Sequence, residues 1–193
     1  MFLRSKSVLL LGGASLGGMI AYEMTQQLRR SGDEVRQVFM IDTPGLGFMP
    51  KSFDSLDDII HYLLNVGEKL TIDKAELQQM SEPDKLTFLA THLSQLPSEI
   101  ERQHQQFVAV FQANMDAMLN YRPESLADVR GVFFAPEQPN DYHPLNLEQA
   151  WLPLFDRGLD VLHVPGNHLT MNRLPNVGRI ARFLTAYLDS DRG

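Results

Sequence analysis

The sequence predicts an α/β fold built on a mostly parallel sheet, and three observations lead to this prediction. Short apolar runs typical of buried parallel strands recur at residues 8–11, 35–41, 129–135 and 159–164. Helical patterns follow the first and the last of these runs, at residues 19–30 and 175–188. A length of 193 residues suits a single domain with a sizeable core, so we expect one domain over residues 1–193.

Residues at their ends mark the first strand, the first helix and the second strand. The run 8–11 leads into a Gly/Ser-rich turn, and the helical pattern 19–30 ends at Ser31-Gly32. The second strand, 35–41, is followed at once by Asp42-Thr43-Pro44-Gly45. Ligands of open α/β sheets bind outside the carboxyl ends of the strands, so residues at these boundaries are site candidates.

Residues between about 50 and 120 predict a helical insertion. Helices are expected at 57–64, 82–93 and 98–119, with Pro83 in a first turn and Ser98-x-x-Glu101 as a capping box. About seventy residues are far more than a crossover between parallel strands requires, so the segment is typical of a lid. Its apolar side chains form either the core of the lid or a pocket for an apolar ligand: Leu63, Leu64, Val66, Leu70, Met80, Phe88, Phe107, Phe111, Met115 and Met118.

The chain after the insertion continues the α/β pattern. The third strand covers 129–135, a short helix with the single Trp151 is expected at 147–157, and the fourth strand covers 159–164. An apolar stripe predicts the last helix, at 175–188. The polar residues 189–193 are expected to form a loose tail.

The turn after the first strand carries the chemistry. It reads Gly13-Ala14-Ser15-Leu16-Gly17, the Gly-x-Ser-x-Gly pattern of a nucleophile elbow, placed between a strand and a helix. Such a turn holds its serine in a strained conformation, and we expect Gly13 and Gly17 to remove Cβ atoms that would collide with the adjoining strand and helix. Ser15 is the predicted nucleophile.

Two further residues complete a predicted triad in the order serine, acid, histidine that α/β-hydrolases use. Asp42 follows the second strand, and His168 follows the fourth strand after Pro165-Gly166-Asn167. His168 would accept and return the serine proton, and Asp42 would orient its imidazole.

Asp42 has alternatives as the acid of the triad. Asp42 is also typical of a residue that caps its own turn, and Glu137 and Asp141, after the third strand, are alternative acids. The histidines outside this constellation are expected to pack or to face solvent, and none has the metal-binding spacing His-Glu-x-x-His: His61, His92, His104, His143 and His163.

The elbow at 12–24 resembles that of the thioesterase domains of non-ribosomal peptide and polyketide synthases. Pro165-Gly166-Asn167-His168-Leu169-Thr170-Met171, followed by Pro175-Asn176-Val177, resembles the same family. The resemblance covers nearly the whole chain and implies an α/β-hydrolase fold. It favours Asp42 as the acid, because the family commonly places the acid after the strand that follows the nucleophile.

The resemblance also implies a reaction and a partner. An acyl, polyketide or peptidyl chain would pass from the phosphopantetheine thioester of a carrier protein to Ser15, and then to water or to an internal nucleophile. No cofactor of the chain itself is implied, because the carrier protein presents the substrate.

The chain departs from that family at its beginning. Family members have several strands before the elbow strand, and one loop among them supplies the second oxyanion donor. Because Ser15 comes so early here, we expect the front strands to be missing and the backbone N–H of Leu16 to be the remaining donor. The unpaired edge of the first strand would then favour self-association.

Composition limits the partners and the compartment. The net charge of −7 argues against nucleic acid, and no apolar stretch approaches the ~18 residues of a membrane-spanning helix. The absence of cysteine suits the cytoplasm. An acidic carrier protein would need a local basic patch, for which Arg29, Arg30 and Arg36 are the candidates.

The function indicated by the sequence is therefore that of a serine thioesterase. Two alternatives stay open: a free-standing serine esterase acting on small or lipid esters, and an inactive fragment that binds acyl chains or a partner.

Overall fold

The strands form one parallel sheet in the computed structural model, which describes residues 9–46, 55–67, 72–92, 104–138 and 146–190. The strands are β1 (Leu9–Ala14), β2 (Val35–Ile41), β3 (Arg130–Pro136) and β4 (Leu159–Val164), and they lie side by side in the order β1-β2-β3-β4. The four predicted strands are confirmed. β1 runs three residues further than expected because Gly12, Gly13 and Ala14 keep their register with β2.

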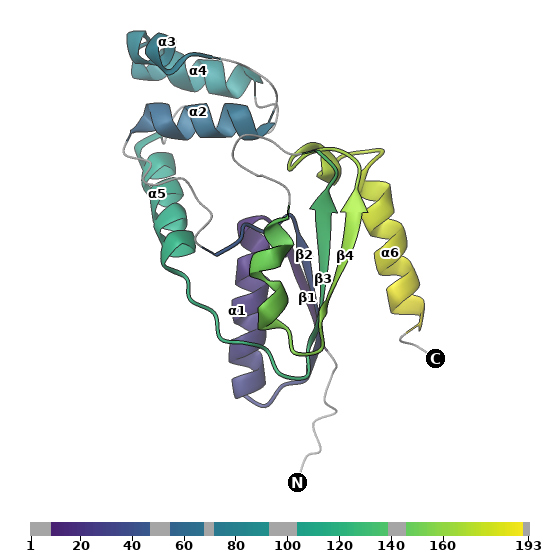
Figure 1. Ribbon diagram of the computed structural model, residues 1–193. Coiled ribbons are helices and arrows are strands. Elements are labelled where there is room, and N and C mark those ends of the chain that lie inside the picture. Colours follow the sequence, from purple (N-terminus) through teal and green to yellow (C-terminus); the bar gives the residue numbers. More distant parts are fainter. Residues whose placement is uncertain (1–8, 47–54, 68–71, 93–103, 139–145, 191–193) are drawn as a thin grey trace, which may run out of the picture.

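Helices cover both faces of the sheet. Helix α1 (Leu16–Arg30) lies on one face and α6 (Val177–Ser190) on the other (Figure 1). Alternate residues of the strands face the two layers, so Met40 packs with Met19 of α1 while Phe39 packs towards Tyr187 of α6. The core is accordingly divided into two apolar clusters, one on each side of the sheet.

A buried tyrosine fixes α1 to the rest of its layer. The ring of Tyr22 is fully buried, with its centroid 5.2 Å from that of Trp151, and its hydroxyl lies 2.9 Å from the carbonyl oxygens of Glu124 and Leu154. Burial raises the pKa of this hydroxyl far above its usual value. Tyr22 therefore holds the segments before β3 and β4 against α1, the helix that follows Ser15.

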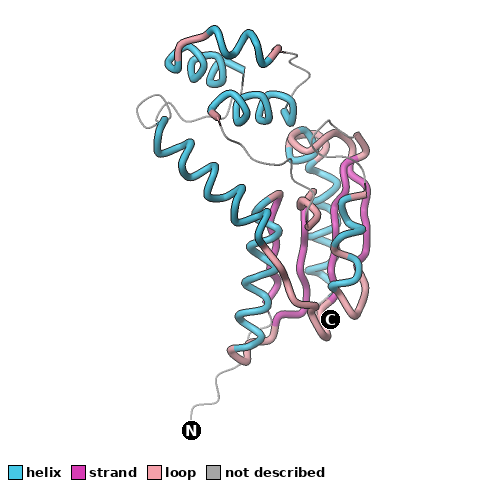
Figure 2. Tube along the Cα trace, turned by 60° about the vertical axis from the view of Figure 1, so that its left-hand side comes forward, coloured by secondary structure: helices cyan, strands magenta, loops and turns pink. Residues whose placement is uncertain are grey.

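The predicted helical insertion is confirmed and lies beyond the carboxyl ends of the strands (Figures 1 and 2). It consists of α2 (Leu56–Gly67), α3 (Lys74–Gln79), α4 (Glu82–His92) and α5 (His104–Asn120). Helix α3 was not expected; the side chain of Asp73 caps it by accepting a hydrogen bond from the N–H of Ala75, 3.1 Å away. Pro83 occupies the first turn of α4 as predicted.

Some predictions for the insertion fall outside the described residues. These are the capping box of Ser98 and Glu101, the position of Leu70, and the side chains of Leu63, Leu64, Val66 and Phe107. Met115 and Met118, proposed as lid residues, are buried in the cluster that contains Tyr22, so they pack α5 onto the body of the molecule.

The predicted short helix at 147–157 is wrong. The structure has two 3₁₀ turns there, η1 (Leu147–Ala150) and η2 (Leu152–Leu154), and the chain then bridges to Leu126 through Phe155. Pro153 explains the difference, because it lacks the N–H that an α-helix would bond to the carbonyl of Gln149.

The last helix is confirmed, although it begins at Val177, two residues later than predicted. None of the described helices is both long enough and apolar enough to cross a membrane.

Candidate active site

Ser15 lies in a strained turn between β1 and α1. Its backbone has φ 52° and ψ −127°, a combination that residues other than glycine rarely adopt. Its N–H donates to the carbonyl of Ile41 across the sheet, 2.9 Å away, and its own carbonyl accepts from Gly18, 3.0 Å away. The turn is therefore held from both sides at the carboxyl edge of the sheet.

The glycines of the elbow differ in how much space a side chain would have. A Cβ on Gly13 would lie 2.1 Å from the carbonyl carbon and oxygen of Gly17, so the expected collision is confirmed there. A Cβ on Gly17 would meet nothing within 4 Å, so the collision expected at that position is wrong. Gly18 is the second crowded position, because a Cβ would lie 1.8 Å from Oγ1 of Thr43. The helix thus starts in close contact with the ends of β1 and β2.

Asp42 follows β2 in a second unusual backbone conformation, with φ 40°. Its N–H donates to the carbonyl of Phe134 in β3, 2.9 Å away, and the residue is 1% exposed. The loop that leaves Asp42 is tied down by Trp151, whose indole N–H donates to the carbonyl of Pro44 at 3.1 Å. These contacts direct the carboxylate towards the end of β4.

His168 meets that carboxylate. Its Nδ1 lies 2.7 Å from Oδ2 of Asp42, and the residue is 8% exposed. A tight turn positions it: Oδ1 of Asn167 accepts from the N–H groups of Leu169 and Thr170 at 3.1 and 3.0 Å. Nδ2 of Asn172 also donates to the carbonyl of His168 at 3.2 Å, so hydrogen bonds hold the backbone that carries the imidazole.

The alternative acids are arranged differently. Glu137 is exposed, and its Oε1 lies 3.4 Å from a guanidinium nitrogen of Arg179 in α6. Asp141 and His143 lie outside the described residues. Of the three candidate acids, Asp42 is the one whose carboxylate contacts His168.

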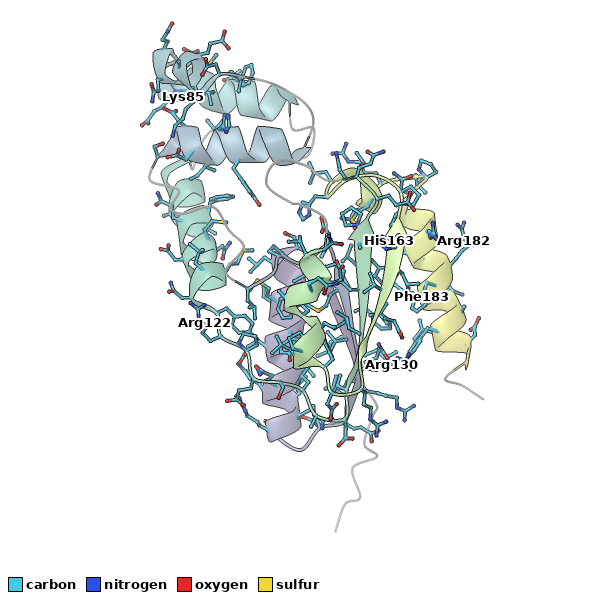
Figure 3. The ribbon with its side chains drawn as sticks, in the orientation of Figure 1. Lys85, Arg122, Arg130, His163, Arg182 and Phe183 are labelled. Carbon is cyan, nitrogen blue, oxygen red and sulfur yellow. The ribbon has the colours of Figure 1, made fainter. Side chains whose placement is uncertain are left out.

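A cavity of about 330 Å³ lies beside Asp42, between the ends of β3 and β4 and the turn η1. Asp42 forms part of its wall, together with Glu137, Glu148 and His163. His163 is exposed at the end of β4 (Figure 3), in agreement with the prediction that it faces solvent. Within the described residues there is no group of His, Cys, Asp and Glu arranged to hold a metal ion.

Leu16 is the first residue of α1, where a helix leaves its N–H groups without intrahelical acceptors. The N–H of Leu16 is therefore available at the elbow, at the positive end of the helix dipole. Among the described residues, the chain presents a serine, a buried carboxylate–imidazole pair and a helix N-terminus at one edge of one sheet.

Comparisons with known proteins match this chain to thioesterase domains. The thioesterase domain family matches residues 3–58, which include β1, α1, β2 and Asp42. The crystal structure of holo-AB3403, a four-domain non-ribosomal peptide synthetase, matches with a TM-score of 0.75 and 25% identity over 96% of this chain and 15% of that one. This chain is similar to the thioesterase domains of non-ribosomal peptide synthetases.

Two further matches describe the relationship. SrfTE, the thioesterase domain that cyclises the lipopeptide antibiotic surfactin, matches with a TM-score of 0.59 and 17% identity over 96% of this chain and 70% of that one, which identifies the α/β-hydrolase fold. A protein of Paxillus involutus named inactive atromentin synthetase invA6 is 25% identical over 93% of this chain and 20% of its own length. The chain thus spans about a fifth of the length of that curated relative.

The sequence did not point to several residues that shape the site. Thr43 packs on Gly18, Trp151 bonds to the carbonyl of Pro44, and Arg179 pairs with Glu137. Only Trp151 carried a signal, as the single tryptophan of the chain in a segment close to β4. The other contacts join residues far apart in sequence without any local pattern.

Proposed function

We propose that this chain is a serine thioesterase that releases an acyl, polyketide or peptidyl chain from the phosphopantetheine thioester of a carrier protein. The observation that carries the proposal is the buried contact between Nδ1 of His168 and Oδ2 of Asp42, at the same sheet edge as the strained Ser15. Similarity to the thioesterase domains of such synthases supports the substrate class.

The first half-reaction acylates the serine. Oγ of Ser15 bonds to the thioester carbonyl carbon while Nε2 of His168 takes the hydroxyl proton. Since Nδ1 faces Asp42, the carboxylate fixes the tautomer that leaves Nε2 free to accept. The N–H of Leu16 donates to the oxyanion, which collapses as the carbon–sulfur bond breaks, and the imidazolium protonates the departing thiolate.

The second half-reaction frees the chain. Water, or a hydroxyl or amine within the bound acyl chain, loses its proton to His168 and attacks the carbonyl carbon of the acyl-serine. The ester bond to Oγ breaks and the imidazolium returns the proton to Ser15. Water gives a carboxylic acid and an internal nucleophile gives a ring; neither step requires a cofactor held by this chain.

Covalent labelling tests the nucleophile. A fluorophosphonate should label the wild-type chain at Ser15 and leave Ser15→Ala unlabelled, because only an activated serine reacts with it. Ser15→Ala should also lose turnover of octanoyl-pantetheine while its circular dichroism spectrum stays that of the wild type. Equal hydrolysis by the two proteins would contradict the proposed mechanism.

A second candidate function is an inactive domain that binds acyl chains or a partner. The name of the relative from Paxillus involutus, an inactive synthetase, favours testing it. A wild-type chain that binds octanoyl-pantetheine but neither reacts with fluorophosphonate nor hydrolyses the thioester would fit this alternative. Faster hydrolysis of an octanoyl oxygen ester than of the thioester would instead indicate a free-standing esterase.

A further inference from the structure

The arginines expected to attract an acidic carrier protein lie away from the active site. Arg29 and Arg30 end α1, and Arg36 is the second residue of β2, so all three sit at the amino ends of the strands. Arg30 and Arg36 are also paired with acids, Glu124 at 2.8 Å and Glu34 at 3.6 Å. A tethered thioester must reach Ser15 at the opposite edge, so these arginines are poorly placed.

Other arginines lie at the edge that carries His168. Arg173 is in the loop that leads from His168 into α6, and Arg179 and Arg182 are on the first turns of that helix, three residues apart on one side. Arg179 reaches Glu137 at the end of β3. Arg182 lies on the side of α6 that faces away from the sheet, whereas Phe183 packs inwards on Phe134 (Figure 3).

The guanidinium of Arg182 folds back towards the start of the helix. One of its nitrogens lies 3.8 Å from the point that a Cβ on Gly178 would occupy. The charge therefore sits over the first turn of α6, near the carboxyl ends of β3 and β4. The helix dipole adds positive potential at the same place.

The charge of these residues is not cancelled within the described part of the chain. No described carboxylate lies within ion-pair distance of Arg173 or Arg182, and Glu137 is the one that pairs with Arg179. The other described lysines and arginines mostly face acids, such as Asp57 and Asp58 in the insertion and Asp128 and Asp160 at the amino edge of the sheet. In a chain of net charge −7, Arg173 and Arg182 are therefore basic residues with which no described carboxylate pairs.

An apolar side chain lies next to one of these arginines. Leu174, beside Arg173, is 84% exposed, more than any other large hydrophobic residue described. An apolar residue with a basic rim is typical of a surface that binds another protein, where the rim charges steer the partner. We call Arg173, Leu174, Arg179 and Arg182 the α6 basic surface.

We propose that the α6 basic surface is the docking site of the acidic carrier protein that delivers the thioester. The inference rests on the proposed thioesterase function. Complementary charge brings the carrier to the end of α6, Leu174 packs against it, and the tethered acyl group enters beside His168. The rest of the acidic chain repels the carrier and so restricts docking to this surface.

Charge reversal tests the surface with two substrates that share an acyl group. The substrates are an acidic acyl carrier protein loaded with octanoyl-phosphopantetheine, and free octanoyl-pantetheine. Arg182→Glu should raise KM for the loaded carrier about tenfold and leave kcat/KM for the free thioester within about twofold. Arg36→Glu, an equal charge change at the other edge, is the matched control and should leave both values unchanged.

Binding separates the docking site from the chemistry. Affinity of the loaded carrier for Ser15→Ala should fall about tenfold when Arg182→Glu is added, and should weaken with added salt. If the wild type hydrolyses neither substrate but the carrier still binds through Arg182, docking stands and the proposed catalysis fails. Equal losses for Arg182→Glu and Arg36→Glu, or no loss for either, or no binding at all, would overturn the docking site.

Discussion

Ser15 and Asp42 both have a positive φ angle, which residues other than glycine rarely adopt. Their φ angles are 52° and 40°, and the described residues contain only two other non-glycine positions with positive φ, Asp128 and Asn146. Such strain persists only where surrounding contacts enforce it, and it concentrates at functional sites. The hydrogen bonds to Ile41 and Phe134 are those contacts, so β2 and β3 hold the two residues in place.

Asp42→Asn should reduce kcat on octanoyl-pantetheine by several orders of magnitude, roughly 10⁴-fold. An amide N–H facing Nδ1 of His168 would favour the wrong tautomer, and the neutral amide oxygen would stabilise the imidazolium less than a carboxylate does. Steady-state kinetics of the purified variant measure the effect. Glu137→Gln is the matched control and should retain activity within about twofold, because Glu137 pairs with Arg179; the reverse pattern would move the acid to the end of β3.

Gly13→Ala should destabilise the fold by about 2–4 kcal/mol, because the new methyl group would meet the backbone of Gly17 at 2.1 Å and neither segment can move freely. Gly17→Ala is the control at the other glycine of the elbow. It has open space and a helical position, so it should be neutral or stabilising by up to about 1 kcal/mol. Urea denaturation followed by circular dichroism compares them, and equal losses would contradict the contact assignment.

The sequence could place Ser15, Asp42 and His168 near one another because Ser15 and Asp42 directly follow strands, His168 comes four residues after β4, and the ends of parallel strands meet at one edge. The structure gives the contact between Asp42 and His168, whereas the catalytic roles of the three residues stay a prediction. The different roles of Gly17 and Gly18 were not accessible, because Thr43 reaches Gly18 across a gap of 25 positions that no local pattern describes.

The helical insertion is held together by charge as well as by apolar packing. Adjacent residues Asp57 and Asp58 at the start of α2 pair with lysines on two different helices, Lys85 of α4 and Lys74 of α3. Burial opposes the charged form of Asp58, but hydrogen bonds from Lys74 and Ser55 outweigh it and hold the pKa of this carboxyl below its usual value. These pairs fix three helices to one another.

Lys85→Met should destabilise the insertion by about 3 kcal/mol, because it leaves the carboxylate of Asp57 buried without its partner. Both side chains of this pair are close to 90% buried, with exposures of 11% and 12%. Lys74→Met is the control, since Lys74 is half exposed, and it should cost about 0–1 kcal/mol. Hydrogen exchange of the α2 and α4 amides measures the loss of stability in each variant. Similar protection in Lys85→Met and Lys74→Met would show that the Asp57–Lys85 pair contributes little.

The end of α1 and the start of α4 were predictable because local signals mark them, whereas α1 begins three residues earlier and α6 two residues later than predicted. The segment after β3 was not predictable, because apolar spacing around Trp151 imitates a helix while Pro153 prevents one. Helix α3 was missed because six residues with one buried leucine give no helical period.

At the scale of the whole molecule, the sheet has two edge strands, β1 and β4. Among the described residues, β1 pairs only with β2. The N–H groups of Leu9 and Ser15 point to β2, so those of Leu10, Gly12 and Ala14 point away from it. The flanks of this edge are partly apolar, with Ile20 and Met24 of α1 51% and 46% exposed.

This edge is a template for another strand, and we expect the 193-residue chain to self-associate through it. The molecular mass measured by light scattering should fall as the protein is diluted. In the same series the amides of Leu10, Gly12 and Ala14 should exchange faster on dilution, whereas those of Leu9 and Ser15, bonded to Glu34 and Ile41, should not change. Ile20→Lys with Met24→Lys should shift the mass towards the monomer, because the added charges oppose association beside β1 without removing a backbone hydrogen bond. A mass that is monomeric at every concentration, with outward amides exchanging at one constant rate, would show that the β1 edge is not used for pairing between copies.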